Sequence, residues 1–200
     1  IIYKSLQSDP LDRFLGIKKL ALALNSRSKA AELDVSGGKS LVREGLQDFR
    51  ESRIERALEC FSEAGRRDSL STAVWNNIAA VKMRQGKWLE AVYDLEKAYK
   101  LSATHPIISS NIGHCFLHLD DDIAVQHWAE QALAMNPWLA RPSVCLVELS
   151  LKAGKPAAAS SYAMQAVVRN PGSRLARLSM AAASEAQNLD QKATEDRQHA

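Results

Sequence analysis

The chain has 200 residues, of which 46% are apolar and 24% charged, and its formal net charge is +3. These values exclude a disordered chain, a collagen-like fibre and a membrane bundle, and the charge excess is too small to favour nucleic-acid binding. Nine glycines and six prolines are few for this length, so long helices with short turns are favoured over a sandwich or a barrel.

Residues 1–37 are predicted to form an N-terminal helical segment. Within it, residues 17–34 are a candidate for the second helix of a degenerate repeat whose first helix is interrupted near Pro10. The small residues that place them in register with the repeats below are Ala23 and Ala30. Because the chain begins with Ile1 rather than methionine, we expect it to be a processed protein or part of a longer one.

Residues 38–173 show a period of 34 residues in their small side chains. Two antiparallel helices pack closely only where one side of the contact lacks bulk, so this period predicts one helix pair per repeat. The three series are Ala57, Ala91, Val125 and Ala159; then Ala64, Ala98, Ala132 and Ala166; then Gly45, Ala79, Gly113 and Val147. The predicted repeats are 38–71, 72–105, 106–139 and 140–173.

Turn residues recur with the same period. Gly or a small polar residue stands where the first helix of each repeat must stop and reverse. These residues are Ser52, Gly86, Asp120 and Gly154. Pro137 and Pro171 close the last two repeats, and residues 174–200 are predicted to be a capping helix over 174–189 followed by a polar tail.

Large apolar residues at helical-face positions should form the core of the stacked repeats. They include Phe49, Phe61, Trp75, Trp88, Leu95, Phe116 and Trp128. This role as core is favoured over any cofactor-binding role, so no cofactor is predicted.

Two short motifs resemble chemical sites, but each lacks a required part. Gly37-Gly38-Lys39-Ser40 ends like a phosphate-binding loop, but Leu33 stands where that loop needs glycine. His114 and His118 are four residues apart on one predicted helix, which suits a metal, but no third ligand is fixed beside them. With no nucleophile near a base and no evident carboxylate pair, the sequence predicts neither a catalytic nor a metal site.

The segment from Trp75 to Ala98 carries a recognisable pattern. It contains Trp75-Asn76-Asn77-Ile78-Ala79, then Gln85-Gly86-Lys87-Trp88-Leu89-Glu90-Ala91, then Lys97-Ala98. This pattern resembles the tetratricopeptide repeat, and the resemblance implies an all-α, right-handed superhelical solenoid of antiparallel helix pairs. Such proteins are non-catalytic scaffolds or adaptors that bind a partner peptide in a concave groove, so the resemblance implies that role here.

The resemblance also implies which residues line the groove, because family members use positions 2, 5, 9, 12 and 13 of each first helix. The asparagines at position 6 are further candidates to bind a ligand backbone. The resulting set is Lys39, Val42, Leu46, Phe49, Arg50, Asn76, Asn77, Met83, Arg84, Ile107, Asn111, His114, Leu117, His118, Arg141, Val144, Glu148, Leu151 and Lys152. Apolar and cationic groups alternate in it, which favours an apolar peptide or helical segment with some acidic residues. A groove filled by the N-terminal segment or by a second copy remains the alternative.

The sequence has two narrower likenesses within the family. Of the residues with which co-chaperones clamp heat-shock protein C-termini, only Asn77 fits, although a shift by one repeat recovers Asn111 and Arg141. Further segments are Asn111-Ile112-Gly113-His114-Cys115, Ala132-Leu133-Ala134-Met135-Asn136-Pro137 and Glu148-Leu149-Ser150. Together with Trp75-Asn76-Asn77 they loosely resemble bacterial accessory proteins of type IV pilus and secretin assembly, which implies a pilus or secretion-system assembly factor as the alternative function.

Cys60, Cys115 and Cys145 are odd in number and widely spaced, which favours a reducing compartment such as the cytoplasm over a disulfide framework. The pilus likeness would instead imply the periplasm or the outer membrane. We expect a protein partner, no nucleic acid and no direct membrane insertion, with self-association left open.

Overall fold

A computed structural model of the protein describes residues 37–198, with side chains as far as residue 192. The chain divides into two compact units, one ending at Ser69 and the other beginning at Leu70. The predicted N-terminal segment, including the candidate degenerate repeat at 17–34, lies outside the described residues except for Gly37.

The first unit contains a helix over residues 37–50 and helix α2 (Ile54–Arg67). The two helices meet at a glycine, because a Cβ atom added at Gly45 would lie 2.7 Å from Cε1 of the buried Phe61 ring. Asp48 is buried in the same unit and its carboxylate accepts a hydrogen bond of 2.6 Å from Arg53 Nε. The small residue expected at this helix contact is therefore sterically required.

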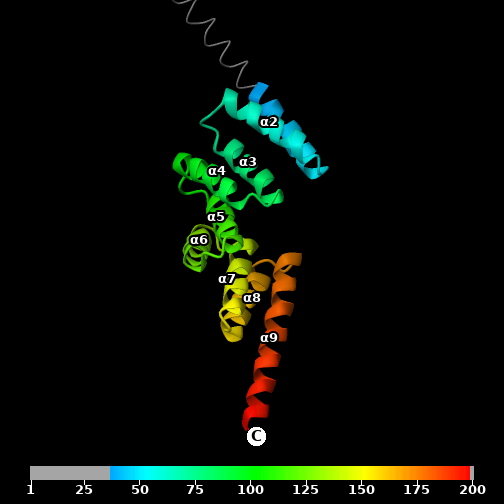
Figure 1. Ribbon diagram of the computed structural model, residues 1–200, viewed down its shortest axis with the longest axis vertical. Coiled ribbons are helices and arrows are strands. Elements are labelled where there is room, and N and C mark those ends of the chain that lie inside the picture. The colour runs from blue at the N-terminus through cyan, green and yellow to red at the C-terminus, as the bar shows by residue number, and fades with distance from the viewer. Residues whose placement is uncertain (1–36, 199–200) are drawn as a thin grey trace, which may run out of the picture. The chain divides into compact units, whose positions relative to one another are not determined.

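Within the described part of the second unit, residues 70–198, seven helices pack in sequential pairs (Figure 1). They are α3 (Thr72–Arg84), α4 (Trp88–Leu101), α5 (Pro106–His118), α6 (Asp122–Met135), α7 (Ala140–Lys152), α8 (Pro156–Arg169) and α9 (Arg174–Gln198). Helix α3 packs on α4, α5 on α6, and α7 on α8, while α5 also contacts α7 and α7 contacts α9. The helices of residues 37–198 thus form the all-α pairs predicted from the sequence, with no strand among them.

The turn between paired helices has a left-handed residue each time. The backbone φ angle is 61° at Ser52, 73° at Gly86, 57° at Asp120 and 65° at Gly154. Glycine adopts this conformation without strain, and aspartate is among the few other residues that tolerate it. The predicted period of the turn residues is confirmed. The left-handed conformation is also adopted at Ser52 and Asp120, where another residue replaces glycine. After Asp120, the carboxylate of Asp121 caps α6 by accepting a hydrogen bond of 3.0 Å from the Ala124 amide.

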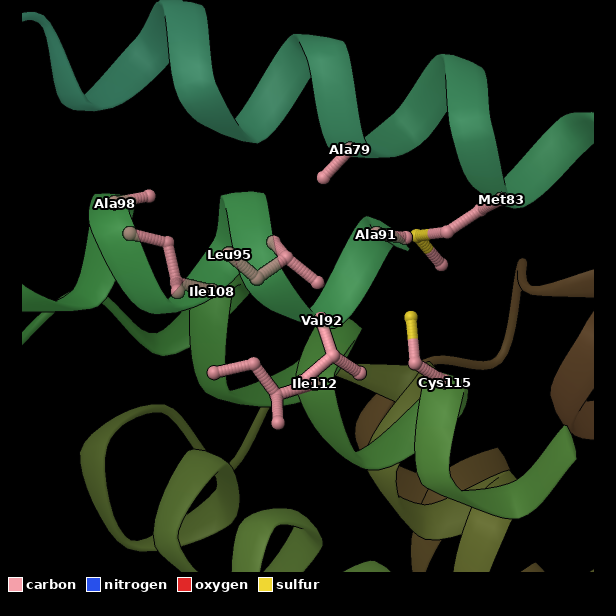
Figure 2. Packing of buried hydrophobic residues seen from close by; sticks show 9 residues of the cluster. All are labelled: Ala79, Met83, Ala91, Val92, Leu95, Ala98, Ile108, Ile112 and Cys115. Carbon is pink, nitrogen blue, oxygen red and sulfur yellow. The ribbon is translucent and has the colours of Figure 1, made fainter. Parts of the chain in front are cut away.

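The core of the second unit is built from the predicted small and large residues. Ala79 of α3 faces Ala91, Leu95 and Ala98 of α4, and all four side chains are fully buried (Figure 2). Ile108 and Ile112 of α5 extend this cluster, and Trp75, Trp88, Phe116 and Trp128 pack around it, partly buried. The assignment of these aromatic residues to the repeat core is confirmed.

The last helix is longer than the sequence analysis predicted. Helix α9 runs to Gln198 as one continuous helix, whereas a polar tail was expected from residue 190 onward. The physical reason is that residues 174–198 contain neither glycine nor proline and are rich in Ala, Gln and Glu, which favour helix. Every helix within residues 37–198 is too short or too polar to cross a lipid bilayer.

Candidate partner-binding surface

A chain of polar side chains joins α3, α5 and α7, the first helices of three successive pairs. Asn111 of α5 donates from Nδ2 to Oδ1 of Asn76 on α3, at 2.9 Å. In turn, Arg141 of α7 donates from its guanidinium to Oδ1 of Asn111, at 3.1 Å. We call the surface of α3, α5 and α7 around Asn76, Asn111 and Arg141 the first-helix surface.

The middle and the end of this polar chain differ in exposure. Asn111 is only 8% exposed, so its two hydrogen bonds satisfy an amide that burial would otherwise penalise. Arg141 is exposed, and its bond to Asn111 uses one of the five N–H donors of a guanidinium. The amide therefore orients the arginine, whose remaining donors can meet an acidic group of a ligand.

Two histidines and a tryptophan form the adjacent part of the surface. The ring of Trp88, at the start of α4, stacks on His118 with 3.8 Å between centroids and an interplanar angle of 7°. His114 meets the same tryptophan edge to face at 5.9 Å and meets His118 at 4.9 Å. These rings are thus engaged in aromatic packing. The groups among the described residues that could together hold a metal ion are instead Glu44, Asp48 and Cys60.

That acidic group in the first unit is already neutralised by arginines. Asp48 pairs with Arg53 at 2.6 Å and with Arg56 at 3.9 Å, and Arg56 also reaches Glu44 at 3.7 Å. A cation bound there would have to compete with two guanidinium groups, so the cluster is better suited to an ion-pair network than to a metal site.

His114 has an unusual electrostatic setting. Burial, the positive charge of Arg141 and the neighbouring His118 together lower the pKa of His114 from 6.5 to about 4. The neutral imidazole is therefore the form that the folded protein accommodates at neutral pH.

This setting predicts a pH-dependent stability. Between pH 6.5 and about 4 the unfolded chain binds a proton at His114 that the folded chain does not, so stability should fall as pH decreases through this range. The slope should approach about 1.4 kcal/mol per pH unit. Urea unfolding at a series of pH values should show a shallower slope for His114→Gln than for the wild type. His127→Gln, which removes an exposed histidine of α6, should retain the wild-type slope.

The other residues predicted for the groove differ in their placement. Met83 and Val144 are buried, and Met83 belongs to the core cluster around Ala91. Lys152 is exposed but pairs with Asp120 at 2.8 Å and with Asp122 at 3.2 Å. Exposed or half-buried positions are held by Asn77, Arg84, Ile107, Leu117, Glu148 and Leu151. Lys39, Val42, Leu46, Phe49 and Arg50 lie on the helix over residues 37–50, in the first unit.

Sequence reasoning missed two features of this surface. Trp88 was assigned to the core alone, although its ring also orders His118. The hydrogen bonds that join Asn76, Asn111 and Arg141 were not foreseen either. Their positions in successive repeats are 5, 6 and 2, which could have signalled contact between neighbouring first helices.

The three cysteines are free thiols. Cys115 and Cys145 are buried, and burial raises the pKa of each thiol to about 12, so neither is a reactive nucleophile at neutral pH. Burial first, and then the nearby carboxylates of Glu44 and Asp48, also raise the pKa of the half-buried Cys60.

No protein-family model matches the sequence, and no curated protein matches it either. Solved structures do match the fold. The crystal structure of MamA protein superposes with a TM-score of 0.63 at 18% identity, covering 80% of this chain and 87% of that one. The first TPR of Spaghetti (RPAP3), bound to the HSP90 peptide SRMEEVD, superposes with a TM-score of 0.57 at 19% identity. The match covers 59% of this chain and 94% of that one.

A third match is PilF of Pseudomonas aeruginosa, with a TM-score of 0.60 at 20% identity, covering 84% of this chain and 77% of that one. At such identities the matches establish the fold alone. They agree with the sequential helix pairs described above. The chain is therefore an all-α protein with the tetratricopeptide-repeat fold.

Proposed function

We propose that the protein is a non-catalytic interaction scaffold whose first-helix surface binds a peptide segment of a partner protein. The observation that carries this proposal is the hydrogen-bonded chain from Asn76 through Asn111 to Arg141. It crosses three helix pairs and ends in an exposed arginine, whose orientation is fixed by a buried amide. Fixing a cation before binding reduces the entropy lost when a ligand is bound.

The surroundings of Arg141 indicate the chemistry of the ligand. Ile107, at the corresponding position of α5, is 45% exposed and offers an apolar contact one repeat away. Asn77 is half-buried and its side chain forms no hydrogen bond within the described residues, so its side-chain amide is available to a peptide backbone. A segment that combines carboxylates with apolar side chains fits this set of groups.

Peptide binding is a property of at least one protein with this fold, since the RPAP3 domain was solved with an HSP90 peptide. That peptide, SRMEEVD, is acidic. The clamp residues of the co-chaperones are largely absent here, so we propose recognition of acidic and apolar segments without assigning that peptide as the partner.

The proposal is tested by selecting binders from a display library of random dodecapeptides on the wild-type protein. Fluorescence anisotropy then measures the affinity of the selected peptides. We expect them to be rich in Asp and Glu with interspersed apolar residues, and Arg141→Glu should weaken binding at least tenfold, about 1.4 kcal/mol.

Lys100→Glu is the matched control, because it makes the same charge reversal at an exposed position of α4. It should bind as the wild type does, and both variants should retain the wild-type helical content by circular dichroism. Selected peptides of basic character, or equal affinities for Arg141→Glu and the control, would refute the proposal.

The alternative role, as a pilus or secretion-system assembly factor, stays a prediction from the sequence resemblance. The match to PilF concerns the fold. Specific co-purification with a pore-forming subunit of a bacterial outer membrane would support that role.

A further inference from the structure

Helix α9 exposes a row of leucines beside the face that packs on its neighbours. Its buried residues, Ala176, Ser179 and Ala183, lie on the face that packs on α7 and α8. In contrast, Leu175, Leu178 and Leu189 are 42%, 56% and 63% exposed, with the small, exposed Ala182 between them. We call Leu175, Leu178, Ala182 and Leu189 the outer row of α9.

The position of α9 in the row of first helices explains this exposure. Leu178 stands at the repeat position that Ser110 occupies in α5 and Val144 in α7, and both of those residues are buried. Helix α5 is followed by α7, and α7 by α9, with direct contacts in each case. Helix α9 is the last of this series among the described residues, so no further helix there covers Leu178.

The outer row is open along the helix. Figure 1 shows the later turns of α9, coloured red, extending past the ends of α7 and α8. Leu175 and Leu189 are 14 residues apart, which corresponds to about 21 Å along a helix axis. The apolar row is therefore long enough to accept another helix.

The sequence of α9 is complementary to itself when two copies run antiparallel. With the twofold axis at Ala182, Leu175 of one copy lies opposite Leu189 of the other, and Leu178 lies opposite the small Ala186. The first turns carry Arg174 and Arg177, whereas Glu185 and Asp190 follow in the second half of the row. An antiparallel pair places the basic half of each helix beside the acidic half of the other, and a parallel pair would place like charges together.

We propose that the outer row of α9 is a self-association surface, and that its occupant is α9 of a second copy of this chain in antiparallel orientation. One helix pair buries less than the roughly 1,600 Å² of a standard protein interface, so the dimer should be of moderate affinity and should dissociate on dilution. The outer row lies on α9 and Arg141 on α7, and the dimer is tested without any peptide, so its failure and that of the proposed peptide binding are distinguishable.

Sedimentation equilibrium over a range of concentrations tests this inference. The wild type should approach twice the 22.0 kDa chain mass at high micromolar concentration, and Leu178→Glu should remain at 22.0 kDa throughout. Ile123→Glu is the matched control, since Ile123 is an exposed apolar residue of α6, and this variant should dimerise as the wild type does.

A cross-link tests the antiparallel register. Because the twofold axis passes near residue 182, Ala182→Cys should form a disulfide-linked dimer on mild oxidation, and Ala134→Cys on the exposed side of α6 should not. Combining Ala182→Cys with Leu178→Glu should abolish the cross-link. A wild type that stays monomeric at high concentration, or a dimer that Leu178→Glu leaves intact, would overturn the proposal.

Discussion

Replacing Ala91 by tryptophan should lower the free energy of unfolding by more than about 3 kcal/mol and loosen the packing of α3 against α4. Ala91 is fully buried and lies with Ala79, Leu95 and Met83 in the core cluster of Figure 2. A tryptophan ring has no space there unless the helices separate. Separation would break the small-residue contact that the repeat depends on.

Chemical denaturation followed by circular dichroism measures this effect. Ala134→Trp provides the control, because Ala134 is exposed in the last turns of α6 and the same ring can project into solvent. The control should unfold within about 0.5 kcal/mol of the wild type. If Ala91→Trp unfolded at the same denaturant concentration as the wild type, α3 and α4 would not be closely packed at Ala91.

The second large effect is expected at the ion pair between α3 and α4, whose carboxylate is buried. Lys82 Nζ lies 2.6 Å from Asp94 Oδ2, and the two side chains are 19% and 4% exposed. Lys82→Met removes the main cation beside a buried carboxylate and leaves only Lys97, at 3.3 Å, to compensate it. Because an uncompensated buried charge is costly, this variant should lose about 3 kcal/mol of stability.

A double-mutant cycle separates the ion pair from the packing around it. Lys82→Met combined with Asp94→Leu removes both charges and should recover most of the stability that Lys82→Met alone loses. Urea midpoints for the four proteins of the cycle give the coupling directly. A double variant less stable than Lys82→Met would show that shape rather than charge governs this site.

Local chemistry explains why the helix pairs could be predicted from the sequence. The small residue at Ala91, the left-handed turn at Gly86 and the small residue at Ala98 each meet a steric requirement that recurs every 34 residues. Such requirements act within one helix pair and exclude most other residue types. The sequence therefore reveals them without knowledge of any neighbouring repeat.

Contacts between repeats were harder to foresee. The bond from Asn111 to Asn76 and the stacking of Trp88 on His118 depend on rotamers, which a position in a repeat does not determine. The end of α9 was missed for a different reason. The residues after 189 are polar, which suggested a tail. A polar segment without glycine or proline, however, does not end a helix.

The proposed site of partner binding spans α3, α5 and α7. It is tested most directly by titrating a selected acidic peptide into isotope-labelled protein and following the amide signals by nuclear magnetic resonance. Binding should shift the side-chain amide of Asn111, the Arg141 guanidinium and the backbone around Asn77, while leaving α6 and α8 unchanged. Shifts confined to α4, α6 and α8 would contradict the claim and place the binding surface on the second helices.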